Sequence, residues 1–267
     1  MEPHCLIAYD PTWVVDTLYH LSDIHIHLYK RHAEYAEVFE HVLAYLKAEK
    51  AARGFTTNRN IPLLCVLTGD ILHSKSDLSP ECVAMTYKLF KDLSEVMPTL
   101  IRDRNNKNRL DSLTPIISDL PTYNPIYYLN ETGLWHYNNL CFGHASIFDY
   151  KIPAPTPGMT SIALFHGRVN GVLLFNGIGA QGEEYTDTDT GTKKVITLND
   201  FKAYDMALFG DIHRHQWLDR TRAYAGSLIQ QNHGETLAGH GLIKWSVAEH
   251  TGQFVPIPNQ YGYVTFQ

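Results

Sequence analysis

The stretch Pro62–Asp70, with the sequence PLLCVLTGD, is typical of a buried strand in an α/β sheet. Its first seven residues are nearly all apolar, as expected of a strand that is covered on both faces. The run stops at Gly69, which allows a sharp turn, and Asp70 follows directly. In an open α/β sheet the loops just past the carboxyl ends of the strands carry the chemistry. Asp70 is therefore a candidate functional residue.

Three further segments have the same form, an apolar run that breaks into Asp, His or Gly. They are TLYHLSDIH, ALFHG and MALFGDIHRH, at residues 17–25, 163–167 and 206–215. Two side chains that are two residues apart on an extended backbone point to the same side, so a DxH or HxH pair can hold one ion. Each segment alone is weak, but the series predicts one metal site formed by Asp23, His25, Asp70, His166, His213 and His215. Two carboxylates and four imidazoles suit Mn²⁺, Fe²⁺ or Zn²⁺ better than Ca²⁺.

The segments between these strands have helical spacing in the first half of the chain. Tyr35, Val38, Phe39, Val42, Leu43 and Leu46 predict a helix that Gly54 closes. Ser79 as N-cap and Pro80 at the first helical position predict a second helix, with Val83, Tyr87, Phe90 and Leu93 as its buried stripe.

Further strands are expected at 17–22, 99–101, 126–129, 140–143, 162–165 and 206–209, and an irregular loop at 181–194. The first half reads as β-α-β, and the second half is rich in strands. The sequence therefore predicts one α/β domain over residues 1–267, with two packed mixed β-sheets flanked by helices.

The composition limits the partners and the compartment. The net charge of −6, from 22 Lys and Arg against 28 Asp and Glu, is not that of a basic nucleic-acid binder. Affinity for nucleic acid would have to come from a local patch, bound cations or a partner subunit. The four cysteines form no CxxC pair, which favours reduced thiols. No apolar run approaches the roughly 20 residues of a membrane span, and the N-terminus does not read as a signal peptide. We expect a soluble intracellular protein.

The motif series resembles the calcineurin-like metallophosphoesterases, and more narrowly the SbcD-like nucleases of DNA repair. The resemblance rests on LSDIHIH, TGDILHSKSDLSPE, FHG, GDIHRHQ and AYAGSLIQQNHGE, and it runs from about Leu18 to the end of the chain. It implies a four-layer sandwich and two metal ions, Mn²⁺ above all, that share Asp70. The first ion would take Asp23, His25, Asp70 and His215, and the second would take Asp70, His166 and His213.

The chain departs from the family at one motif. The family carries GNHD after its third strand, whose Asn binds the second ion and whose His assists the leaving group. Here residues 99–116 read TLIRDRNNKNRLDSLTPI, without that motif. Asn105 or Asn106 is either a replacement ligand or a polar loop residue. His73 is the nearby candidate for a substitute catalytic acid, or else a phosphate contact. Arg102, Arg104 and Arg109 either contact phosphate or are solvated.

The resemblance implies a Mn²⁺-dependent phosphodiesterase that acts on DNA, with a Rad- or SbcC-type ATPase as partner and a homodimer as an option. The first alternative is a phosphoesterase for a smaller substrate, which the net charge favours. The second is an impaired member that binds metal, and DNA or an ATPase, without cleaving, which the missing GNHD favours. Activity is expected to be reduced.

Overall fold

The computed structural model describes residues 4–6, 12–55, 60–74, 77–102, 113–121, 123–187 and 190–264. Its larger sheet has seven strands in the order β1-β6-β7-β8-β11-β13-β12. These strands are β1 His4–Cys5, β6 Gly133–Tyr137, β7 Leu140–His144, β8 Thr160–His166, β11 Met206–Gly210, β12 Gln216–Asp219 and β13 Arg222–Tyr224. The sheet is mixed, because β7, β8, β11 and β13 run parallel, while β6 is antiparallel to β7 and β12 is antiparallel to β13. At the far edge, β1 is parallel to β6.

The second sheet has six strands in the order β15-β14-β2-β3-β4-β5. They are β2 Thr17–Leu21, β3 Leu63–Leu67, β4 Thr99–Arg102, β5 Ile126–Leu129, β14 Gly241–Ser246 and β15 Thr251–Pro256. Strands β2 to β5 are parallel, and the C-terminal hairpin of β14 and β15 adds an antiparallel edge. The prediction of an α/β protein with two packed mixed sheets is confirmed.

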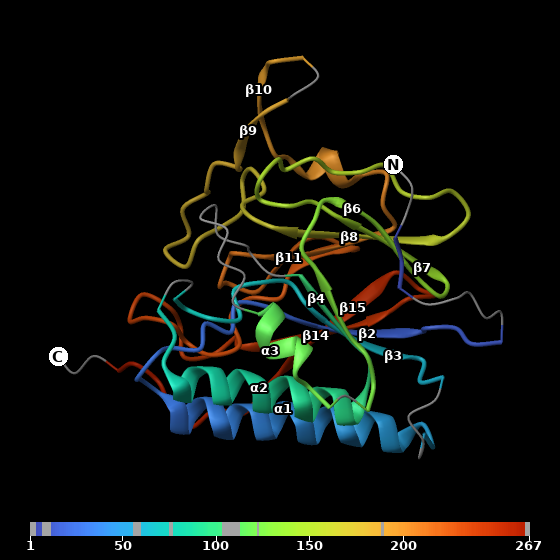
Figure 1. Cartoon of the computed structure of the whole chain (residues 1–267). Helices are drawn as coiled ribbons and strands as arrows, with labels where there is room; N and C mark the ends of the chain where they lie inside the picture. Colours follow the sequence, from blue (N-terminus) through green and yellow to red (C-terminus); the bar gives the residue numbers. More distant parts are fainter. Residues whose placement is uncertain are drawn as a thin grey trace.

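The helices cover the six-stranded sheet (Figure 1). They are α1 His32–Ala52, α2 Pro80–Val96 and the short α3 Thr114–Ser118. Ser79 caps α2 as predicted, since its side chain accepts a hydrogen bond from the Cys82 amide at 3.2 Å. All six predicted core residues of α1 are buried.

The predicted stripe of α2 is confirmed, and the buried face is broader than predicted. Phe90 and Leu93 are buried, and Val83 and Tyr87 are half-buried and pack against the core. Cys82 and Thr86, which were not predicted, are also buried.

The structure has three apolar cores. One lies between the helices and the six-stranded sheet, one between the two sheets, and one on the outer face of the seven-stranded sheet. In β2, Tyr19 and Leu21 pack toward the helices, while Leu18 packs into the core between the two sheets. The outer face of the seven-stranded sheet, with Phe165 and Phe209, is covered by loops and the 3₁₀ helix η1 Leu198–Phe201.

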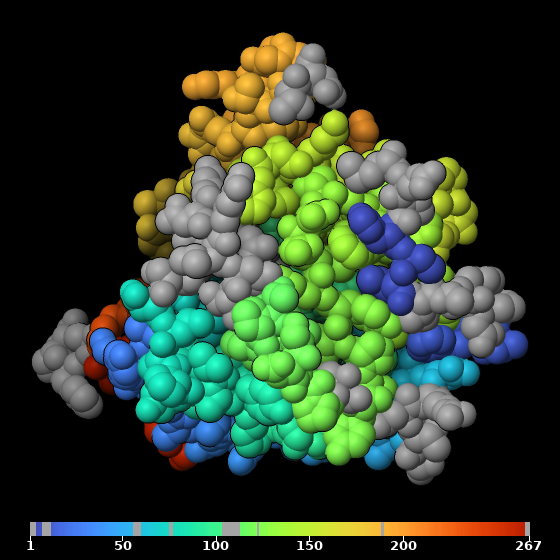
Figure 2. All heavy atoms as spheres, viewed as in Figure 1, coloured from blue at the N-terminus to red at the C-terminus, as the bar shows by residue number. Residues whose placement is uncertain are grey.

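The predicted irregular loop at 181–194 contains a two-stranded antiparallel hairpin, β9 Glu184–Thr186 and β10 Lys193–Val195. Figure 2 shows this hairpin projecting from the top of the molecule, with α2 and α3 on the lower part of the same face. The hairpin is therefore an extension of the sandwich rather than part of either large sheet.

Cys5, Cys65, Cys82 and Cys141 are thiols rather than disulfides in the described part of the chain, and the last three are buried. Across the described ranges, no helix is long and apolar enough to cross a membrane.

Candidate metal centre

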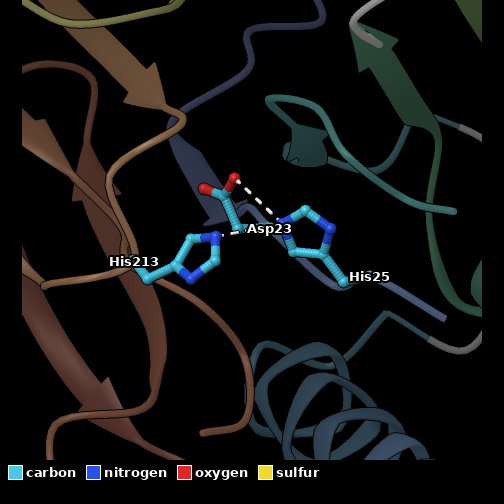
Figure 3. A group of neighbouring side chains, drawn as sticks. All are labelled: Asp23, His25 and His213. Carbon is cyan, nitrogen blue, oxygen red and sulfur yellow. Dashed lines mark hydrogen bonds and ion pairs between the residues drawn. The ribbon is translucent and has the colours of Figure 1, made fainter. Parts of the chain in front are cut away.

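Five of the six predicted ligands meet where the two sheets face each other. Asp23, His25 and His213 form one group, and Asp23, Asp70 and His166 form a second. Within each group the potential ligand atoms lie within 4.8 Å of one another. Figure 3 shows Asp23, His25 and His213 turned toward a common point from two segments of the chain. Because Asp23 belongs to both groups, the two are parts of one centre that could hold metal.

Parallel pairing brings these residues together. β2 pairs with β3, so the loops that carry Asp23 and Asp70 leave the six-stranded sheet side by side. β8 pairs with β11 in the other sheet, and His166 lies opposite Gly210 in that register. The Asp211 amide then donates to both oxygens of Asp23, at 3.2 and 3.1 Å, and links the two sheets directly.

The backbone of the centre is strained. Asp23, His25, Asp70 and Asp211 have φ values of 48°, 52°, 45° and 92°, in a region that residues other than glycine rarely adopt. Such conformations cost on the order of 1–3 kcal/mol each and persist only where the surroundings impose them. Here the imposed contacts include the His25 amide, which donates to the Asp70 carbonyl at 2.8 Å. Strain gathered at four neighbouring polar residues indicates a functional site.

The imidazole of His25 lies close to His213 and Asp70, at distances that suit ligands of one ion. Its Nε2 is 3.0 Å from Nε2 of His213 and 3.7 Å from Oδ2 of Asp70. Two ligand atoms about 2.0–2.1 Å from one ion would lie about 3.0–3.4 Å apart. The same Asp70 oxygen is 3.6 Å from Nε2 of His166. Asp70 therefore stands between an imidazole of each group.

His166 is the most completely enclosed of the imidazoles. It is fully buried, and its Nδ1 donates to the Thr68 carbonyl at 2.8 Å, which leaves Nε2 as the lone-pair nitrogen. That Nε2 has no hydrogen-bond partner in the described part of the chain. The oxygens of Asp70 and Asp211 lie 3.6 Å from it, beyond hydrogen-bond distance. A buried nitrogen that faces two carboxylates at this distance fits a bound cation.

Asp211 was not among the predicted ligands, and His215 takes no part in either group. His215 directs Nδ1 to the Tyr224 carbonyl at 2.9 Å and stacks on Phe254, with ring centroids 4.1 Å apart. Among the described residues, His215 is in neither ligand group, whereas Oδ1 of Asp211 lies 3.6 Å from Nε2 of His166. The signal was present: Gly210-Asp211 repeats the Gly69-Asp70 dipeptide at a strand end.

Glu235 is a second residue that the sequence did not reveal. It is buried, and its Oε1 accepts a hydrogen bond from Nδ1 of His213 at 2.8 Å. The Gln231 backbone amide donates to Oε2 and the Asn232 side-chain amide donates to Oε1, each at 2.8 Å, so the carboxylate is fixed in place. A carboxylate on the far nitrogen of a ligand histidine orients the ring and makes it a stronger ligand. Glu235 thus directs Nε2 of His213 toward the centre.

Replacing Glu235 by Gln should weaken metal binding about 10–100-fold, the effect typical of outer partners of ligand histidines. The amide keeps the size of the side chain but loses the negative charge that His213 faces. Calorimetric titration with Mn²⁺ measures the change. Glu249→Gln, at an exposed glutamate in the turn between β14 and β15, is the control. Unchanged Mn²⁺ affinity in Glu235→Gln would show that His213 needs no orientation.

The same substitution should change the pH dependence of the metal-free protein. Burial opposes protonation of His213, but the hydrogen bond to Glu235 and the nearby Asp23 carboxylate outweigh it and raise the His213 pKa to about 9. The unfolded imidazole has a pKa of about 6.5, so protonated His213 stabilises the folded state below that pH. This stabilisation is lost as the pH rises through about 9. The free energy of unfolding should fall less over this range in Glu235→Gln.

His73 lies beside the centre rather than inside it. Its ring is exposed, 5.6 Å from that of His25 and 3.9 Å from that of His27, centroid to centroid. Burial lowers the pKa of His73, and the Asp70 carboxylate opposes this effect. His73 is thus an exposed imidazole next to a candidate ligand histidine.

Arg102 does not contact a phosphate at the surface. It is fully buried at the end of β4, where Nε donates to Nε2 of His144 at 3.1 Å and Nη2 to the Ala145 carbonyl at 3.0 Å. Arg104, Asn105, Asn106 and Arg109 lie outside the described residues. The replacement of the GNHD asparagine therefore stays a prediction.

Comparison with known proteins adds a relative but no activity. No family model matches the sequence. A protein of Acanthamoeba polyphaga mimivirus, described only as uncharacterized, is 37% identical over 268 aligned residues. The alignment covers 93% of this chain and 18% of the viral protein, so the chain spans less than a fifth of that protein's length.

Proposed function

We propose that this chain is a metal-dependent phosphodiesterase of the SbcD-like type, which holds two divalent ions, preferably Mn²⁺. The observation that carries the proposal is the position of Asp70, whose Oδ2 lies 3.7 Å from Nε2 of His25 and 3.6 Å from Nε2 of His166. One carboxylate between two imidazole groups is the arrangement that a two-ion site requires. Fe²⁺ and Zn²⁺ suit the same ligands.

The charge balance supports a phosphodiester as substrate. Two divalent ions would bring four positive charges to three carboxylates, Asp23, Asp70 and Asp211. One positive charge remains, which attracts a phosphodiester anion. Ions in such a site polarise the phosphoryl oxygens and lower the pKa of the attacking water.

The protein's own residues position the reaction and handle its protons. Hydrogen bonds to Thr68 and Glu235 fix the rings of His166 and His213, so neither ligand can rotate away. His73 is exposed at the rim, and its protonated form, which its lowered pKa confines to acidic pH, can donate a proton to the leaving oxygen. In this proposal His73 takes the role that the GNHD histidine has in the family.

The proposed substrate is DNA, at its ends or along a strand, and the proposed partner is an ATPase of the Rad or SbcC type. A nuclease assay with Mn²⁺ on single- and double-stranded DNA tests the function. Protein purified in chelator and assayed without metal is the blank. Cleavage that needs Mn²⁺ would support the proposal. Absence of both DNA cleavage and bis-p-nitrophenyl phosphate hydrolysis, with Mn²⁺ bound, would favour a member that binds metal without cleaving.

Replacing His73 by Ala should lower kcat for a DNA phosphodiester by about 10²-fold, since a positioned acid contributes about 10²–10⁴-fold. Mn²⁺ affinity should stay the same, because His73 lies outside both ligand groups. The loss should be smaller for bis-p-nitrophenyl phosphate, whose leaving group needs no proton. His41→Ala, on α1 with its Nδ1 at the Pro258 carbonyl, is the control. Equal losses on both substrates would assign His73 to phosphate binding rather than acid catalysis.

A further inference from the structure

A pocket of about 360 Å³ opens directly beside the metal centre. Three segments line it: 174–176, 211–214, and the loop that contains Asn232, Gly234 and Glu235. Two candidate ligands, Asp211 and His213, form part of its wall. In Figure 1 the loop around residue 175 and the loop around residue 233 lie on the left of the molecule. A substrate whose phosphate sits at the centre would therefore extend a neighbouring group into this pocket.

The outer wall of the pocket is held in a defined conformation. The amide of Gln216 exchanges two hydrogen bonds with the backbone of Leu173, at 2.9 and 2.8 Å. Arg214 donates from Nη1 to the Leu174 carbonyl at 3.1 Å. The Leu174 amide also donates to the Ile178 carbonyl at 2.9 Å, which closes the turn around Phe175. The wall is thus built before any ligand arrives.

The lining combines flat apolar surface with hydrogen-bonding groups. Leu174, Phe175 and Ile212 are apolar, while Asn176, Arg214 and Asn232 carry amide and guanidinium groups. Arg214 and Asn232 use part of their hydrogen-bonding capacity within the protein, and a purely apolar ligand would bury the remainder without compensation. A planar heterocycle with donors and acceptors on its edge satisfies both kinds of wall. The volume is near the lower end of the roughly 300–1,000 Å³ of ligand pockets, which suits one nucleoside rather than a duplex.

We propose that this pocket receives the nucleobase of the nucleotide whose phosphate lies at the metal centre, with Phe175 as the stacking surface and Arg214 and the two asparagines at the base edge. The inference rests on the proposed function and names the unit that the site selects. A base inside the pocket has left its duplex, because its edge and faces are occupied by protein. The preferred substrate therefore presents an unpaired nucleotide.

Binding measurements on the Mn²⁺-loaded chain test the pocket without requiring turnover. The ligands are inorganic phosphate, adenosine 5′-monophosphate, adenosine, and a short single-stranded oligonucleotide with a 5′-phosphate. Adenosine 5′-monophosphate should bind at least tenfold more tightly than phosphate. Phe175→Ala should remove about tenfold of that affinity, as expected for loss of base stacking, and leave phosphate affinity unchanged. Ile178→Ala removes an apolar side chain that is 62% exposed in the same turn, and it is the matched control.

The outcomes separate the pocket from the metal chemistry. Equal affinity for phosphate and adenosine 5′-monophosphate, or equal losses for both in Phe175→Ala, would overturn the nucleobase pocket while the proposed function stands. Absence of Mn²⁺ binding would overturn the proposed function, and adenosine binding that Phe175→Ala weakens would then still support the pocket. If adenosine 5′-monophosphate binds more tightly than phosphate but the oligonucleotide does not, the base that occupies the pocket comes from free nucleotides rather than from DNA.

Discussion

Asp70→Asn should lose metal binding and metal-dependent hydrolysis together, because one carboxylate oxygen serves the imidazoles of both groups. The loss of Mn²⁺ affinity should exceed the roughly 10–100-fold that removal of an outer partner causes. Asparagine tolerates the left-handed backbone of position 70, where φ is 45°, so the fold should survive. Elemental analysis of protein purified without chelator, followed by Mn²⁺ titration, measures the metal content. Hydrolysis of bis-p-nitrophenyl phosphate measures the activity.

Asp119→Asn makes the same chemical change at an exposed residue that ends α3, and it should leave both readouts intact. Thermal melting in chelator should give similar Tm values for both variants, which separates loss of metal from loss of fold. An Asp70→Asn protein that still binds two ions with unchanged affinity would remove the bridging role from Asp70. Asp23, which belongs to both groups, would then be the next carboxylate to replace.

Gly210→Ala should disrupt the centre from within the sheet. A Cβ atom at position 210 would lie 2.3 Å from Oγ of Ser22, 2.5 Å from the Thr68 carbonyl oxygen and 2.8 Å from Nδ1 of His166. The carbonyl is backbone and cannot rotate away, so β11 must move or the Thr68–His166 hydrogen bond must break. Overpacking of this kind typically costs about 1–3 kcal/mol. We expect a lower Tm and, below that Tm, weaker Mn²⁺ binding because Nε2 of His166 is displaced.

Gly179→Ala is the matched control, since its added Cβ would lie no closer than 4.0 Å to the Gly171 carbonyl oxygen, the nearest atom beyond its chain neighbours. It should change neither Tm nor Mn²⁺ affinity by much. Chemical denaturation gives the free energy of unfolding, and titration of the folded variant gives the metal affinity. A Gly210→Ala protein that binds Mn²⁺ as tightly as the parent would show that the two sheets can separate at β11 without cost to the centre.

The strands that carry the candidate ligands could be predicted because each combines a strong apolar run with an abrupt polar end. β3 and β11 are examples, and their ends fix where Asp70 and Asp211 emerge. Local patterns could also place the cap of α2 at Ser79, since capping depends on a few adjacent residues. The orientation of His215 could not be predicted in this way. It lies near the end of β11, and its contacts with the Tyr224 carbonyl and the Phe254 ring form only in the folded chain.

Two other features, the roles of Glu235 and Gln216, could not be predicted because they depend on contacts between distant segments of the chain. Glu235 reaches His213 across 22 residues, and Gln216 holds a turn 43 residues away. Neither residue stands in a pattern that marks it, since a single Glu or Gln in a loop is usually solvated. The nucleobase pocket combines three such segments, so only the folded chain brings its walls together.

The left-handed residues of the centre also bear on how this protein can change over evolution. His25 and His250 have almost the same φ, 52° and 51°, yet only His25 belongs to a ligand group. Glycine would relax the backbone at either position, but at position 25 it would remove a ligand. Selection for a bound metal would therefore keep histidine at position 25 although glycine would relieve the backbone there, whereas position 250 lies outside both ligand groups. A descendant with glycine at positions 23, 25 and 211 would have a less strained backbone at the centre, and it would lack three side chains that could hold metal.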